Sequence, residues 1–157
     1  MPTTASSNKS PHAAKIATKI QAGESLAHAD FSNQDLYAIA LSQANLEQVN
    51  FSGSVLTNAD LVEVNLQGAN LQNADLRGAD LTGANLTGAD LTGAYLSRAD
   101  LRGANLSRAN LTDAQFQVTI YDLQTTFPEG FDYQSSGAVG PGAKLNGAYL
   151  NTANLRG

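Results

Sequence analysis

The sequence predicts an all-β solenoid, a chain wound into coils that stack along one axis. Two observations predict this fold class. Leu or Phe occupies every fifth position from Leu26 to Phe116, nineteen consecutive positions without an exception. The surrounding positions repeat too: two before is mostly alanine, one before is mostly Asp or Asn, and two after is often glycine. We call the Leu or Phe the centre of each five-residue unit.

Neither an α-helix nor a long flat strand can use this pattern. In a helix, with about 100° per residue, successive centres would step around the axis and form no apolar stripe. In a flat strand, an odd period would send alternate centres to opposite faces of the sheet. The pattern fits a unit of three extended residues followed by a bend. The alanine and the centre then face an enclosed interior, and the Asp or Asn between them faces water.

The bend explains the glycines two positions after the centre. A type II turn needs a positive φ at its third residue, which glycine adopts without steric cost. We therefore expect positive φ at these corners, which include Gly53, Gly68, Gly78, Gly83, Gly88, Gly93 and Gly103.

The segment ADLRGADLTGANLTGADLTGAYL, from Ala74 to Leu96, resembles the pentapeptide-repeat family, whose consensus is A-[D/N]-L-x-x. The resemblance covers residues 24–118. It implies a right-handed quadrilateral β-helix with four units per coil, so that residues twenty apart stack on one another. Phe31 would then stack on Phe51. The bulkier interior residues Ile39, Val49 and Val64 would lie in the early coils.

The N-terminal residues predict a capping helix. Ser10 suits the N-cap, Pro11 the first helical position and Gly23 the stop. Ala13, Ile16, Ala17 and Ile20 would form its apolar face. We assign residues 1–10 to a flexible N-terminus and residues 11–23 to a helix of about 11–22 that covers the first coil, because exposed strand edges invite association. A free helical arm is the alternative.

The repeat is interrupted after Val118. Tyr121, with Thr119 two before it, can serve as a degenerate twentieth unit that completes a fifth coil. The interruption spans 119–142, and its stretch TTFPEGFDY resembles a segment of cyanobacterial pentapeptide proteins. It carries four of the ten aromatic residues, Tyr121, Phe127, Phe131 and Tyr133. These aromatics would pack as a plug on the tube or, alternatively, form a recognition loop on a rigid scaffold. Leu145, Leu150 and Leu155 then resume the spacing in three further units, 143–157.

Composition excludes several classes of function. The absence of cysteine excludes disulfides and thiolate metal sites. A net charge of -5 argues against non-specific binding to nucleic acid or an anionic membrane. There is no apolar run long enough to cross a bilayer, and the first ten residues lack the apolar segment of a secretory signal. We expect no direct nucleic-acid or membrane partner and a cytoplasmic location. A thylakoid lumen or periplasm is the alternative if a signal was removed.

The sequence offers no catalytic constellation, and we predict no enzyme, no cofactor and no metal site. We expect His12 and His28 to be surface histidines, because neither can be paired with a nucleophile from sequence spacing. The twenty-residue register aligns Asp60, Asp80 and Asp100 on one side of the tube. It aligns Asp30, Asn50, Asn70, Asp90 and Asn110 on another. Stacked carboxylates can share Ca²⁺, but Asn and Asp exchange freely at this unit position, so polarity matters there more than charge.

These features predict a non-enzymatic structural or protein-interaction scaffold with an unidentified protein partner. The candidate interaction surface comprises the four aromatics of the interruption and Asp60, Asp80 and Asp100. A homodimer through the C-terminal end is a further expectation, because the final units have no evident cap.

The alternative implied by the resemblance is a DNA mimic that binds a type II topoisomerase such as gyrase. Duplex DNA carries about one charge per 1.7 Å, nearly three per coil rise. Residues 24–118 hold eight Asp, three Glu and four Arg, a net charge of -7, or about 1.5 per coil. Arg98, Arg102 and Arg108 lie in the later coils, where a mimic would be acidic.

Overall fold

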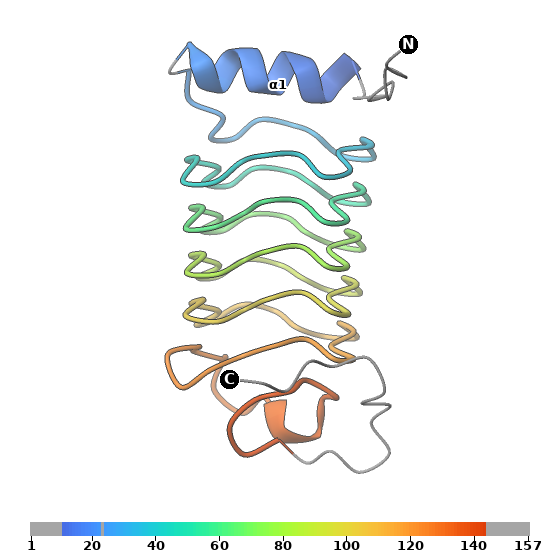
Figure 1. Ribbon diagram of the computed structural model, residues 1–157, viewed down its shortest axis with the longest axis vertical. Coiled ribbons are helices and arrows are strands. Elements are labelled where there is room, and N and C mark those ends of the chain that lie inside the picture. Colours follow the sequence, from blue (N-terminus) through green and yellow to red (C-terminus); the bar gives the residue numbers. More distant parts are fainter. Residues whose placement is uncertain (1–10, 23, 144–157) are drawn as a thin grey trace, which may run out of the picture.

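The computed structural model describes residues 11–22 and 24–143. From residue 24 to residue 122 the chain forms a tube of stacked coils (Figure 1). The units predicted around Leu145, Leu150 and Leu155 lie outside the described residues. Parallel bridges join residues twenty apart, from Asp30 with Asn50 to Asp100 with Ile120, which confirms the predicted register of four units per coil. Each unit contributes a single bridge residue, and the described residues contain no longer strand. The bridges fall into four columns, one on each face of the tube.

Backbone hydrogen bonds explain why the coils stack at this register. In the unit that begins at Leu71, the N–H groups of Leu71 and Asn73 donate to carbonyls of the next coil at 2.7 and 2.9 Å. The N–H of Ala74 donates to the Leu71 carbonyl at 3.1 Å and closes the turn. The N–H of Asp75 donates to the previous coil at 2.9 Å. Four of the five amides in the unit therefore have backbone acceptors.

The corners have the predicted backbone conformation. All nineteen positions two after a centre, from His28 to Val118, have a positive φ, between 51° and 68°. Glycine occupies seven of them, and the glycines predicted to turn the chain are confirmed. The other twelve carry side chains in the left-handed region, among them Ala38 and the β-branched Val118.

The core is a stack of centres and alanines along the tube axis. Every centre from Leu36 to Leu106 is buried, as is each alanine two positions before a centre from Ala59 to Ala104. Phe31 and Phe51 stack with ring centroids 5.6 Å apart, as predicted. Ile39, Val49 and Val64 are buried in the early coils, where they replace alanine.

The helix α1 (Pro11–Gln21) crosses the N-terminal end of the tube (Figure 1). Its extent agrees with the predicted range. Ile16 is buried within the core, and Ile20 packs against it. A salt bridge of 3.3 Å joins Lys19 to Glu24, just beyond the helix. Residues 1–10, with the predicted N-cap Ser10, and the side chains of His12, Ala13 and Ala17 lie outside the described part of the chain.

The repeat continues past Val118. Thr119 is buried and donates from Oγ1 to the Leu96 carbonyl at 2.7 Å, and Ile120 bridges Asp100. The twentieth unit raised as an alternative is therefore present, and the irregular segment begins later than Thr119. Thr126 then bridges Asn105 with one extra residue in the coil. A short 3-10 helix, η1 (Tyr133–Ser135), lies in the segment that follows.

Candidate interaction surfaces

The outward Asp and Asn side chains complete the hydrogen bonding of the backbone. Each accepts, at Oδ1, the N–H of the residue two positions later, which is the one amide of the unit without a backbone partner. All fourteen Asp and Asn residues at bridge positions from Asp30 to Asn110 make this bond, at 2.9 to 3.3 Å. Both residue types offer the same Oδ1 acceptor, which explains why they exchange freely.

The four faces differ in what they present to solvent. We number them by their bridge columns: the first face contains residues 30, 50, 70, 90 and 110, and the second contains 35, 55, 75, 95 and 115. The third face contains 40, 60, 80, 100 and 120, and the fourth contains 45, 65, 85 and 105. The two predicted stacks of Asp and Asn residues lie as expected on the first and third faces.

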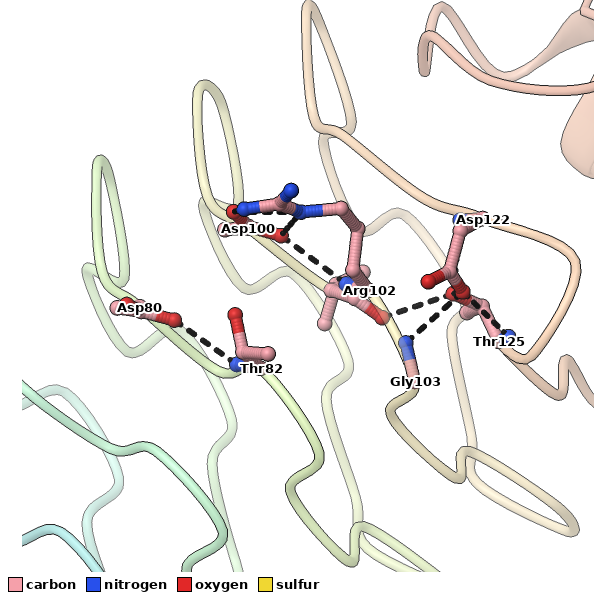
Figure 2. A network of polar contacts seen from close by, with 8 residues as sticks. Asp80, Thr82, Asp100, Arg102, Gly103, Asp122 and Thr125 are labelled. Carbon is pink, nitrogen blue, oxygen red and sulfur yellow. Dashed lines mark hydrogen bonds and ion pairs between the residues drawn. The ribbon is translucent and has the colours of Figure 1, made fainter. Parts of the chain in front are cut away.

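The third face carries the predicted column Asp60, Asp80 and Asp100. Figure 2 shows its C-terminal part, where Arg102 folds back onto Asp100. The guanidinium donates from Nη2 to Asp100 Oδ2 at 2.7 Å and from Nε to both carboxylate oxygens at 3.0 Å. Asp100 raises the pKa of Arg102 above its ordinary value. The column is therefore acidic at Asp60 and Asp80 and neutralised at Asp100.

Asp122 continues the third face after the column. Its Oδ1 accepts the N–H of Gly103 at 2.9 Å and the N–H and hydroxyl of Thr125 at 3.0 Å (Figure 2). Burial alone would raise the pKa of Asp122, but these hydrogen bonds outweigh it, and the pKa lies below its ordinary value. Asp122 thus holds together the turn at which the repeat gives way to the irregular segment.

The second face has an exposed apolar stripe, which we define as Tyr37, Val55 and Tyr95. Their exposed fractions are 62%, 37% and 40%. Val55 and Tyr95 occupy bridge positions, and Tyr37 is the outward residue directly after the centre of its unit. The Tyr37 hydroxyl accepts a hydrogen bond from Asn58 Nδ2 at 3.3 Å. The large hydrophobic side chains exposed elsewhere, Ile120 and Leu123, lie at the C-terminal end of the third face.

Asp75 and Arg77 on the second face are paired with each other, and Asp35 of the same column lies outside this pair. Arg77 donates to Asp75 from Nε at 2.8 Å and from Nη2 at 2.5 Å. The hydrogen bonds from Arg77 hold the pKa of Asp75 below its ordinary value. The pair lies between Val55 and Tyr95 in the column. The stripe is therefore interrupted by a neutralised pair of side chains rather than by a net charge.

The fourth face is nearly uncharged and carries an asparagine ladder. Asn65 Nδ2 donates to Asn45 Oδ1 at 3.0 Å, and Asn85 Nδ2 donates to Asn65 Oδ1 at 3.1 Å. Stacked amides thus bond along the tube as well as to their own backbone. The ladder ties neighbouring coils together.

The four predicted aromatics come together at the C-terminal end of the tube. Tyr121 meets Phe127 and Tyr133 edge to face, each with ring centroids 5.5 Å apart. Phe127 stacks on Tyr133 at 5.0 Å, and Phe131 packs on Phe116 at 5.3 Å. Burial raises the pKa of Tyr121, and its hydroxyl donates to the Pro141 carbonyl at 2.8 Å. A cavity of about 390 Å³ opens beside these rings.

The structure therefore separates the predicted surface into two places. The aromatics close on each other and on the last coil, in the arrangement expected of a plug, while Asp60, Asp80 and Asp100 lie along the third face. His28 is exposed at a corner with φ 60°, as predicted. Sequence reasoning missed Tyr37, Val55 and Tyr95. A search of outward positions for apolar residues in the twenty-residue register would have found them.

No group of three or more His, Cys, Asp or Glu in residues 11–22 and 24–143 is arranged to hold a metal ion. In the same part of the chain, no helix combines the length and apolar character needed to cross a bilayer.

The similarity to known proteins lies in the repeat region. The family model for pentapeptide repeats matches eight copies, over residues 25–53, 35–73, 59–98 and 89–117. A search of curated proteins found no significant match.

Among solved structures, the chain is similar to a pentapeptide repeat protein from the Arabidopsis thaliana thylakoid lumen. The two are 39% identical, with a TM-score of 0.60 over 62% of this chain and 68% of the other. A pentapeptide repeat protein from Nostoc PCC 7120 is 37% identical, with a TM-score of 0.47 over 81% and 93% of the two chains. Rfr23 from the cyanobacterium Cyanothece 51142 is 33% identical, with a TM-score of 0.41 over 62% and 63%. The chain belongs to the pentapeptide-repeat family, whose members fold as right-handed quadrilateral β-helices.

Proposed function

We propose that the protein is a non-enzymatic scaffold that binds a protein partner through its second face. The observation that carries the proposal is the exposed stripe of Tyr37, Val55 and Tyr95 on one face of a tube whose other outward positions are mostly polar. Tyrosine is enriched in the cores of protein interfaces because it combines a large apolar surface with a hydroxyl.

The side chains of the second face indicate what kind of surface a partner needs. Asp75 and Arg77 already pair with each other, which leaves Asp35 as the charge in this bridge column for a partner to neutralise. A suitable partner presents an apolar patch with hydrogen-bond acceptors for the tyrosine hydroxyls. Long-range electrostatic attraction then contributes little to binding, and we expect weak dependence on salt.

The rigidity of the tube supports the same role. In a unit such as 71–75, every backbone amide has a partner in a neighbouring coil, in the turn or in an Asn side chain. A surface held in place before binding loses little conformational entropy when the partner arrives.

We also propose that the protein has no catalytic activity. Carboxylates from Asp30 to Asp100 at bridge positions accept backbone amides, which is a structural use of the side chain. His28 is exposed at a corner of the tube, where it has no enclosed site to act in.

We propose that α1 caps the first coil. Its buried Ile16 covers the end of the core, and this would shield the unpaired coil edge from other chains. The substitution Ile16→Asp should cause concentration-dependent association in sedimentation experiments, while Lys15→Asp on the exposed side should not. A monomeric Ile16→Asp protein with unchanged stability would contradict the capping role.

Consensus repair of the second face tests the binding proposal. In the triple variant Tyr37→Ser, Val55→Asn and Tyr95→Asn, each residue takes a type that the repeat uses at the same unit position. The added asparagines would accept the Thr57 and Ser97 amides, so the variant should fold at least as stably as the original chain. We expect partner capture to fall more than tenfold. The matched control changes the fourth face, with Gln67→Ser and Thr87→Ser, and should capture normally.

Equal capture by the triple variant and the control would contradict the second face as the binding surface. The DNA-mimic alternative makes a different prediction, inhibition of gyrase supercoiling. The pairing of Asp75 with Arg77 and of Asp100 with Arg102 lowers the negative charge on two faces and favours the scaffold instead. Inhibition near stoichiometric amounts would reverse this preference.

For the compartment, we propose the thylakoid lumen or periplasm as the first location to test. The support is the similarity to a protein of the Arabidopsis thylakoid lumen. Fractionation of cells that express the natural gene tests this, and recovery with cytoplasmic markers would favour the cytoplasm.

A further inference from the structure

The cavity of about 390 Å³ beside the aromatic rings is lined by residues of the segment 121–133 and by Pro141. Its volume lies within the range of ligand sites in proteins, about 300–1,000 Å³. Three rings of its wall belong to Tyr121, Phe127 and Tyr133, and the carboxylate of Asp122 belongs to the same wall. The cavity therefore combines aromatic surface with an acidic group.

One side of the cavity belongs to a further repeat unit, hidden in residues 138–142. Ala138 is buried, as the alanine of a unit is, and Val139 bridges Ile120. Gly142 has a φ of 77°, like the corner residue of a unit. The segment therefore has the backbone features of a regular unit, although its centre is a glycine.

Tyr121 is fixed between the last regular coil and the hidden unit. A Cβ on Gly140, the centre of that unit, would lie 2.5 Å from the Tyr121 carbonyl oxygen and 2.7 Å from its ring, so the ring takes the space of a centre. The Tyr121 N–H donates to the Val139 carbonyl at 3.1 Å, and its hydroxyl donates to the Pro141 carbonyl at 2.8 Å. This part of the wall is therefore held in place before a ligand binds.

The other rings form a stack that leads from the core of the tube to the cavity. Phe131 packs on the buried centre Phe116 at 5.3 Å, and Phe127 packs on Phe131 at 5.6 Å. Tyr133 stacks on Phe127 at 5.0 Å with an angle of 6° between the rings. The faces of aromatic rings carry the negative side of the quadrupole and attract cations. An aromatic wall of this kind favours a positively charged ligand over a negative one.

Asp122 adds a full negative charge to the wall. Its Oδ1 accepts the N–H of Gly103 at 2.9 Å and the N–H groups of Gln124 and Thr125 at 3.0 Å. Burial acts to raise the pKa of Asp122, but these hydrogen bonds outweigh it and keep the pKa below its ordinary value. Figure 2 shows that the hydrogen bonds drawn to Asp122 converge on one carboxylate oxygen. A cation that binds at Oδ2 therefore leaves the turn intact.

The surroundings of the cavity have the same sign of charge. Residues 119–143 contain the three acids Asp122, Glu129 and Asp132 and no Lys or Arg. Leu123, which also lines the cavity, is 82% exposed and places an apolar side chain beside the carboxylate. A complementary ligand carries a positive group next to an apolar one.

We propose that this cavity binds an arginine side chain of a protein partner, with an apolar neighbour of that arginine packed against Leu123. A guanidinium is planar, stacks on aromatic faces and pairs with a carboxylate through two parallel hydrogen bonds. It is also less strongly hydrated than the ammonium group of lysine, so entry into the cavity costs less. The site shares no residue with the stripe on the second face and stands whether or not that face binds a partner.

A nuclear magnetic resonance titration of the full chain tests the proposal. The probe is the dipeptide N-acetyl-leucyl-arginine amide, and saturable shifts are expected at the amides of Gly130 and Tyr133. The same dipeptide with glutamine in place of arginine should bind roughly tenfold more weakly or worse, because it lacks the charge that Asp122 recognises. The lysine dipeptide should fall between the two.

Three variants separate the parts of the site. Asp122→Asn keeps Oδ1 as an acceptor but removes the charge, and it should weaken the arginine probe roughly tenfold while leaving the glutamine probe unchanged. Asp113→Asn is the matched control, because Asp113 is an exposed carboxylate at a corner of the tube that does not line the cavity. Leu123→Ser should weaken the leucyl-arginine probe but not the corresponding glycyl-arginine probe.

Four results would overturn the proposal. Without saturable shifts from the arginine probe, the cavity is not a site for this side chain. Equal affinity for the arginine and glutamine probes would show that the charge is not recognised. Equal losses in Asp122→Asn and Asp113→Asn would reduce the effect to net charge. Binding of tetramethylammonium as tight as that of the arginine probe would assign the cavity to a small organic cation instead of a protein segment.

Discussion

The backbone of Gly140 lies directly against Tyr121, with no room for a side chain between them. A Cβ at residue 140 would lie 2.5 Å from the Tyr121 carbonyl oxygen, a backbone atom that cannot rotate away. We predict that Gly140→Ala separates residues 138–143 from the last coil, because overpacking typically costs about 1–3 kcal/mol. Faster hydrogen exchange at the Tyr121 amide would report this separation.

Gly130→Ala serves as the control for that substitution. Gly130 has a φ of 80°, and a Cβ there would meet nothing within 4 Å. Its cost should come from the backbone alone and leave the Tyr121 amide protected. Equal exchange at Tyr121 in both variants would contradict the packing argument.

The Asp and Asn residues of the repeat should be replaceable by each other but not by alanine. Asn105 Oδ1 accepts the Ser107 N–H at 3.0 Å and the Ser107 hydroxyl at 2.6 Å. Asn105→Asp keeps this acceptor and should leave the free energy of unfolding nearly unchanged. Asn105→Ala removes it and should cost about 1 kcal/mol. Urea unfolding of both variants checks the difference, and equal losses would show that the acceptor is unimportant.

Alanine-to-glycine substitutions should have opposite effects at two positions of the unit. Ala38 sits at a corner with φ 51°, where a left-handed conformation costs an L-residue about 1–2 kcal/mol. Ala38→Gly removes that strain at an entropic cost of about 0.5–1 kcal/mol, so we expect a modest gain in stability. Ala79 is buried and lies outside the positive-φ region, so Ala79→Gly should destabilise. Thermal unfolding distinguishes the two, and a loss of stability in both would refute the strain argument.

The fold could be predicted from the sequence because the period of five is strict and the centres are always Leu or Phe. The corners follow from that pattern, while the twenty-residue register and the Phe31–Phe51 stack follow from the resemblance to pentapeptide-repeat proteins. The unit at 138–142 escaped sequence reasoning because Gly140 stands where a leucine is expected, and only the position of Tyr121 explains the exchange. When a side chain from a neighbouring coil occupies the space of a centre, the five residues of the unit itself do not reveal it.

The candidate surface was harder to predict than the fold. The sequence singles out Phe127, Phe131 and Tyr133 as a group, but whether they pack together or face a partner depends on their folding against Phe116 and Tyr121. The stripe on the second face was missed for a different reason. Val55 and Tyr95 depart from the repeat forty residues apart, and they share a surface only when the coil register brings them together.

Acid should weaken the junction held by Asp122. Its folded-state pKa lies below the ordinary 3.8, because hydrogen bonds from Gly103 and Thr125 outweigh the effect of burial. A lowered pKa stabilises the fold above about pH 4, and this contribution is lost as pH falls through the folded-state value. Asp122→Asn keeps Oδ1 as an acceptor but does not titrate. The difference in free energy of unfolding between the original chain and Asp122→Asn should therefore be largest near neutral pH and shrink in acid. Urea unfolding from pH 7 to pH 2 measures it, and parallel pH profiles for the two proteins would show that Asp122 does not contribute through its charge.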